Sequence, residues 1–133
     1  MDHISTEGIS IRFDPVGGVI DDVEFSFGGV TLHPMHRAPW LVSGEALPDH
    51  VAPVERKLAG DFFCAPFGRS APDVPIHGPA ANGSWRGSGQ TRAADGAVST
   101  RYELTEPIHG ARLTKEITLR PGQPIVYQRH VFD

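Results

Sequence analysis

The sequence predicts an all-β fold in which short strands are joined by many turns. Fifteen glycines and twelve prolines among 133 residues exceed the usual share of turn-forming residues. Several segments alternate apolar and polar residues with a period of two, which is the pattern of a half-buried strand. A chain of this length suits one domain with one core, so residues 1–133 are assigned to a single domain.

The first two predicted strands form a hairpin. Apolar residues alternate with polar ones over residues 9–13 and again over residues 19–27. Between them, residues 14–18 read Asp-Pro-Val-Gly-Gly, which is strong turn chemistry. Two alternating runs joined by such a turn indicate an antiparallel pair.

The central stretch, from Thr31 to about Thr91, lacks a strand period. It is rich in proline, and only residues 53–58 suit a short helix, which Gly60 would end. So long a span without regular structure is uncommon in a compact domain and is usually functional when it is ordered.

The C-terminal third predicts an antiparallel meander of three strands. Residues 98–104 and 113–120 alternate apolar and polar side chains, and Pro121–Pro124 supplies a turn. The last run, residues 125–132, has apolar residues on both parities. We therefore expect that strand to be buried on both faces, in the interior of a sheet.

Composition narrows the functional classes. The net charge is −4 and the basic residues are scattered, which argues against nucleic-acid binding and against a membrane surface. No run is apolar enough to span a membrane, and no secretory signal is visible at the N-terminus. Cys64 is the one cysteine, which excludes an intrachain disulfide and fits a reducing compartment. We expect a cytoplasmic protein.

Two loop motifs hold the chemistry-bearing residues. The first motif, Gly60–Arg69, reads GDFFCAPFGR, and the second motif, Ile76–Trp85, reads IHGPAANGSW. Loops held by a β-scaffold commonly carry binding residues. His77 is the candidate catalytic residue, because imidazole can donate or accept a proton near neutral pH. A histidine that only binds a loop carbonyl is the alternative.

Four further residues are candidate substrate-binding groups, each with a structural alternative. Trp85 offers an apolar face for a sugar but equally suits the core. Asn82 supplies both a donor and an acceptor. Arg69 could bind vicinal hydroxyls or remain a solvated arginine. Asp61 would act as a proton carrier if buried, or would tie the loop through backbone N–H groups.

Metal and phosphate sites have little support in the sequence. His33 and His36 have the spacing of a ligand pair, but no third ligand is specified. The glycine-rich run at residues 85–90 lacks the lysine and the following helix of a phosphate loop. Cys64, which has aromatic neighbours, is expected to be an inert core thiol. No cofactor is implied.

The two motifs resemble those of the aldose 1-epimerase family, within the galactose mutarotase-like superfamily. Leu58–Arg69 resembles the family's loop in which an arginine follows Pro-Phe. His77-Gly78, with Asn82 and Trp85, resembles its His-Gly-x-x-Arg/Ala-x-x-x-Trp element. The resemblance implies a β-supersandwich of which residues 1–133 are the N-terminal half, truncated at the C-terminus.

The resemblance also implies a reaction, the interconversion of α and β anomers of a free hexose. A base removes the proton of the anomeric hydroxyl while an acid protonates the ring oxygen, and the opened sugar rotates and closes again. His77 corresponds to the family's first site histidine, near the ring oxygen, and Arg69 to its substrate-binding arginine. The family's acid histidine and base glutamate match no residue here, and neither His109 nor His130 is assigned to those roles.

Two other functional classes remain open. The chain could bind a carbohydrate without catalysis, or it could be a β-rich assembly module without loop chemistry. An incomplete sandwich would leave strand edges open, so we also expect association between copies of the chain.

Overall fold

The chain forms two four-stranded antiparallel sheets in a computed structural model, which describes residues 1–69 and 71–133. The first sheet has the order β1-β2-β3-β4 and the second has the order β5-β6-β7-β8. The strands of the first sheet are β1 (Asp2–Thr6), β2 (Ile9–Asp14), β3 (Val19–Phe27) and β4 (Val30–Leu32). Those of the second are β5 (Trp85–Arg92), β6 (Val98–Leu104), β7 (Leu113–Leu119) and β8 (Val126–Phe132).

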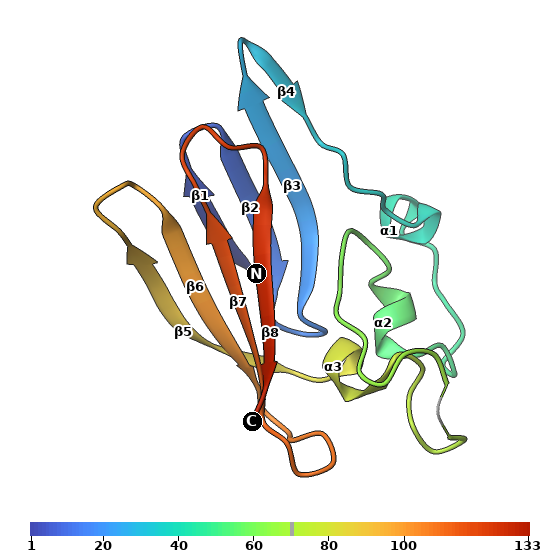
Figure 1. The fold of residues 1–133 in the computed structure, drawn as a ribbon. Coiled ribbons are helices and arrows are strands. Elements are labelled where there is room, and N and C mark those ends of the chain that lie inside the picture. The colour runs from blue at the N-terminus through green and yellow to red at the C-terminus, as the bar shows by residue number, and fades with distance from the viewer. Residues whose placement is uncertain (70) are drawn as a thin grey trace.

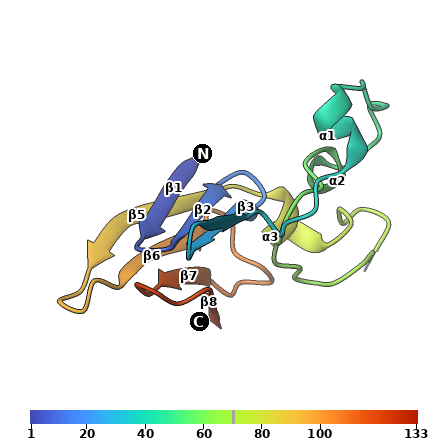
Figure 2. The ribbon, with the colours of Figure 1, turned by 90° about the horizontal axis from the view of Figure 1, so that it is seen from above.

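Three short helices connect the sheets. They are α1 (Pro39–Ser43), α2 (Pro53–Arg56) and α3 (Gly78–Asn82), and each begins with a proline at one of its first two positions. Figure 1 shows the helices grouped with their loops beside the sheets. Figure 2 shows the two sheets as layers, with the helices beyond one end. The all-β prediction is confirmed as a β-sandwich.

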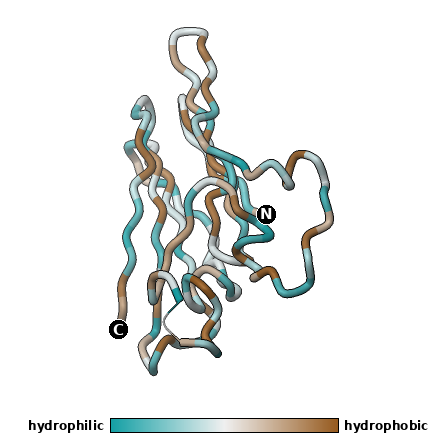
Figure 3. The backbone as a smooth tube through the Cα atoms, turned by 90° about the vertical axis from the view of Figure 1, so that its right-hand side faces the viewer, coloured by the Kyte–Doolittle hydropathy of each residue, from teal (hydrophilic) through white to brown (hydrophobic). Residues whose placement is uncertain are grey.

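The core lies between the two sheets. The alternation of apolar and polar residues along the strands (Figure 3) directs one side of each sheet inward. Phe13 of β2 and Tyr102 of β6 meet there, with ring centroids 4.1 Å apart, and both side chains are buried. Large apolar residues with almost no exposure also include Ile4, Ile11, Ile20, Leu113, Ile117 and Leu119.

The predicted hairpin and meander are both confirmed. β2 pairs with β3, with a bulge between Arg12 and Phe13, and β6, β7 and β8 pair in sequence order. The predicted helix is present as α2, but it ends at Arg56, four residues before Gly60. β1, β4, β5, α1 and α3 were not predicted, because they are short or, in β5, interrupted by Gly87 and Gly89.

The prediction for the last strand was wrong. β8 is an edge strand of the second sheet, and Tyr127, Gln128, Arg129 and Phe132 are exposed. Apolar residues occur on both of its faces, but β7 lies on one side only. In β8, apolar residues on both faces of the strand therefore did not indicate a position in the interior of the sheet.

Candidate functional site

The structure places the two loop motifs in direct contact. The Ala65 N–H donates to the His77 carbonyl oxygen at 3.3 Å, and the His77 N–H donates to the Gly68 carbonyl oxygen at 2.7 Å. Gly78 packs against the Ala65 carbonyl so closely that a Cβ on Gly78 would collide with it. Backbone contacts thus fix the second motif against the first.

His77 lies at the centre of this contact. Its ring is 5.7 Å from that of Phe62 and 5.6 Å from that of Phe67, measured between centroids. Its Nδ1 is buried and has no hydrogen-bond partner among residues 1–69 and 71–133. An imidazole nitrogen of this kind can bind a polar ligand atom, because a buried polar group gains from a partner.

The backbone of His77 is unusual as well. Its φ is 65°, in the left-handed region, and the residue immediately precedes α3. Non-glycine residues adopt this conformation uncommonly, and they are concentrated at functional sites. The left-handed turn starts the helix at Gly78.

Arg69 and Phe67 lie on the exposed part of the same loop. Phe67 is 81% exposed, although it is a large apolar residue that contacts His77. Arg69 is exposed and directly follows Gly68, whose carbonyl accepts the His77 N–H. The exposed Phe67 ring therefore contacts the imidazole, and the exposed Arg69 follows the residue that binds the His77 backbone.

Asn82 uses its side-chain amide to hold the backbone. Its Nδ2 donates to the carbonyl oxygens of Ile76 and Gly78, both at 2.8 Å, and its Oδ1 accepts the Val54 N–H at 3.1 Å. The amide therefore joins α3 to α2 and to the chain before His77.

Trp85 is a core residue. It is 4% exposed, and its Nε1 donates to the Ala80 carbonyl oxygen at 2.9 Å. The ring also packs against Gly18, where a Cβ would collide with it. The buried Trp85 ring therefore holds α3 through Ala80 and leaves no face exposed for a sugar.

Asp61 connects the first motif to both sheets. Its backbone exchanges hydrogen bonds with Ile20 of β3, at 2.8 and 3.1 Å. Its side-chain Oδ2 accepts a hydrogen bond from Gln128 Nε2 of β8 at 2.6 Å. The alternative in which Asp61 ties the loop through backbone groups matches this placement, although the tie is backbone to backbone.

A second polar group, on β7 and β8, was missed in the sequence. Lys115 is fully buried, and its Nζ donates to the Gly18 carbonyl oxygen at 2.9 Å and lies 5.4 Å from the Phe13 ring centroid. Burial lowers the pKa of Lys115 to about 8, although the charge of Asp61 acts in the opposite direction. The signal was available, because Lys115 has the same parity as Leu113 and Ile117.

His130 is the cross-strand neighbour of Lys115. Its ring stacks on Phe63 with centroids 3.9 Å apart, and its Nε2 is buried without a partner among the described residues. Burial lowers the pKa of His130 to about 4, and the positive charge of Lys115 adds to this effect while Asp61 opposes it. At neutral pH the imidazole is therefore uncharged.

An apolar cleft of about 210 Å³ opens between β3 and β8, beside Asp61 and Gln128. Phe25, Met35 and Val126 contribute to its lining.

Cys64, in the same loop segment as Asp61, is half-buried. Burial, and to a lesser extent the charge of Asp61, raise the pKa of its thiol. A raised thiol pKa lowers its reactivity.

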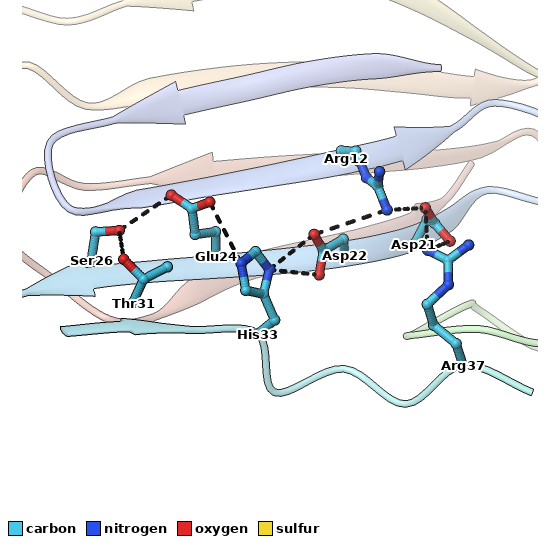
Figure 4. Close-up of polar contacts among 8 residues, drawn as sticks. All are labelled: Arg12, Asp21, Asp22, Glu24, Ser26, Thr31, His33 and Arg37. Carbon is cyan, nitrogen blue, oxygen red and sulfur yellow. Dashed lines mark hydrogen bonds and ion pairs between the residues drawn. The ribbon is translucent and has the colours of Figure 1, made fainter. Parts of the chain in front are cut away.

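His33, one of the two histidines with the spacing of a ligand pair, lies beside carboxylates. His33 Nδ1 lies 3.2 Å from an Asp22 carboxylate oxygen and its Nε2 lies 3.7 Å from Glu24, on the outer surface shown in Figure 4. Nearby, Asp21 pairs with both Arg12 and Arg37. In the part of the chain that the structure describes, no three potential ligands gather around a metal site.

Comparison with known proteins finds no matching family model, no matching curated protein and no matching solved structure. Among the described helices, none is long and apolar enough to cross a membrane.

Proposed function

We propose that the protein binds a hexose at the exposed side of the His77 loops and exchanges its anomers, as aldose 1-epimerases do. The observation that carries the proposal is the His77 imidazole, held in a left-handed turn with a buried Nδ1 that has no partner in the described residues. The two motifs that resemble the family are also the two segments that pack together.

In this proposal the His77 imidazole contacts the ring oxygen of the hexose. Proton transfer to that oxygen accompanies cleavage of its bond to the anomeric carbon, while the anomeric hydroxyl loses its proton to a base. The C1–C2 bond then rotates, and closure on the other face of the carbonyl returns both protons. Phe67 supplies an apolar surface for sugar C–H groups, and Arg69 donates to hydroxyls. Asn82, Trp85 and Asp61 position the loops through the contacts described above.

Carbohydrate binding without catalysis is the second candidate. It is favoured because no residue in the chain corresponds to the family's general base. The two candidates differ in one observable, since both predict sugar binding and only the first predicts faster anomer exchange.

The test is NMR of freshly dissolved α-glucose and α-galactose, which follows anomer exchange with and without the protein. The informative variant is His77→Asn, because asparagine tolerates a positive φ while losing the imidazole. His109→Asn is the matched control, since His109 also has a positive φ, 51°, and is exposed in another turn. We expect acceleration that His77→Asn abolishes and His109→Asn retains. Sugar line broadening without acceleration would favour the second candidate, and no effect of either kind would refute both.

A further inference from the structure

Three of the four sheet edges are protected against pairing with another chain. On β1, the carbonyl oxygens of His3 and Ser5 accept hydrogen bonds from the Gln90 and Arg92 side chains. The edge strand β4 has three residues, and β5 has a register irregularity between Gly87 and Gln90. Short strands, irregular registers and occupied edges all hinder edge-to-edge pairing.

The β8 edge has none of these protections. β8 is seven residues long, pairs with β7 without a register shift and contains no proline. The backbone exchange between Arg112 and Asp133, at 2.9 and 3.0 Å, defines a hydrogen-bonded pair in the β7–β8 register. Such pairs alternate along an antiparallel ladder. The backbone N–H and C=O groups of the odd-numbered residues of β8 therefore bond to β7, and those of the even-numbered residues point away from β7, toward the open edge.

The open groups are therefore the N–H and C=O of Val126, Gln128, His130 and Phe132. None of these backbone groups has a further hydrogen-bond partner in residues 1–69 and 71–133. A partner strand must place its own outward-facing residues opposite these four.

We propose that the protein dimerises by antiparallel pairing of β8 with β8 of a second copy, about a two-fold axis at Arg129. In this register Val126 lies opposite Phe132 and Gln128 opposite His130, so outward-facing residues meet at every hydrogen-bonded pair. All four pairs form, which gives about eight backbone hydrogen bonds. A two-residue shift toward the N-terminus would instead bring Pro124, which has no N–H, opposite Phe132.

Side chains suit the same register. Tyr127 lies opposite Val131 on the outer face, and an aromatic residue beside a β-branched one is a favourable cross-strand pair. Arg129 meets its copy at the axis, which opposes the pairing, and the charge of Glu116, the cross-strand neighbour of each arginine within its own sheet, offsets that repulsion. The pairing would join two four-stranded sheets into one continuous sheet, and it does not depend on the proposed hexose binding.

Sedimentation velocity over a range of protein concentrations tests the association itself. We expect a shift from the monomer mass of 14.4 kDa toward twice that mass, and a melting temperature that rises with concentration. A monomer at every concentration would overturn the proposal.

Cysteine cross-linking tests the register, in a Cys64→Ala background. Arg129→Cys should form an intermolecular disulfide alone, because the axis brings the two substituted positions together in a non-hydrogen-bonded pair. Tyr127→Cys and Val131→Cys should each remain uncross-linked alone and cross-link when mixed. A dimer that does not follow this pattern uses another interface and also overturns the proposal.

Charge reversal provides a test that needs no disulfide. The double variant Tyr127→Lys/Val131→Lys should be monomeric, because like charges would lie opposite each other. The variant with glutamate at both positions should also be monomeric, and mixing the two should restore a heterodimer. Circular dichroism of each variant shows whether the fold is retained. Folded variants that still form homodimers would contradict the pairing.

Discussion

Lys115 shows how one residue can set the pH response of the protein. Its ammonium group is fully buried between the sheets, with one backbone carbonyl and two aromatic rings around it. Removing a charge from water is costly, so burial shifts the protonation equilibrium of Lys115 toward the neutral amine. Burial of Lys115 therefore destabilises the folded state only at a pH at which its amine is protonated.

We expect stability to rise as the pH increases from about 8 to 10.5. The pKa of Lys115 is lowered to about 8 in the fold from 10.5, so the unfolded chain binds more protons in this window. The gain is at most ~3 kcal/mol. Urea unfolding of the parent and of Lys115→Met should be compared from pH 7 to pH 9.5, below the titration of Tyr102, whose pKa is raised by burial.

The Lys115→Met variant should lack this rise, because methionine keeps the apolar stem without a titrating group. The difference between the two pH profiles isolates Lys115 from the other titrating side chains. Parallel profiles for the parent and the variant would show that the folded state tolerates the charge.

At the scale of the element, the loop motifs depend on a glycine. Gly78 begins α3 with a φ of 73°, and its α-carbon faces the Ala65 carbonyl of the first motif. Any side chain there would separate the two motifs. Gly110 is a useful comparison, because it has a φ of 85° and no atom within 4 Å of the position that a Cβ would take.

Gly78→Ala should therefore destabilise the fold by about 3 kcal/mol, the combined cost of a left-handed alanine and overpacking. Gly110→Ala should cost about 1 kcal/mol, from the backbone alone. Equilibrium unfolding measures both. Equal costs would mean that the loop moves to accept the methyl group, and that the contact between the motifs is not rigid.

Strands with clear alternation could be predicted from the sequence, whereas edges could not. β2 and β6 alternate buried and more exposed residues along their whole length, β7 does so after its first two residues, and β3 does so over residues 21–24. The turn residues that flank these strands are explicit in the sequence. β5 was missed because its glycines and exposed side chains break the pattern. β8 was misplaced because residue pattern alone does not say how many neighbours a strand has.

The candidate site was likewise predictable from the sequence only in part. The family resemblance singled out the two motifs, and the structure shows that they are in contact. The sequence left open whether Trp85 is buried and whether the Asn82 amide is free, since both depend in part on packing against residues distant in the chain, Gly18 for Trp85 and Val54 for Asn82. Lys115 was detectable by parity alone.

At the scale of the whole molecule, the two sheets depend on one shared core. Phe13 from the first sheet packs on Tyr102 from the second, and the Tyr102 hydroxyl donates to Asp2 of β1 at 2.9 Å. Side chains from both sheets form one continuous apolar cluster. We therefore expect the sheets to unfold together.

Phe13→Ala should lower the free energy of unfolding by about 3–5 kcal/mol, because it leaves a cavity against Tyr102. Phe13→Leu, which keeps most of the volume, should cost less. Tryptophan fluorescence and circular dichroism should give coincident transitions in the parent and in both variants. Transitions that separate would show that one sheet remains folded without the other.

The position of Asp61 between Ile20 and Gln128 has a consequence for motion. Along β1, the sheets are linked by several hydrogen bonds, including those of Tyr102, Thr6 and Gln90. Along β3, the hydrogen bonds of the described residues connect to β8 only through Asp61, which bonds to both Ile20 and Gln128. Breathing of the sandwich should therefore begin on the β3 side, and amide hydrogens of Ile20 and Asp61 should exchange with solvent before those at the β1 side do.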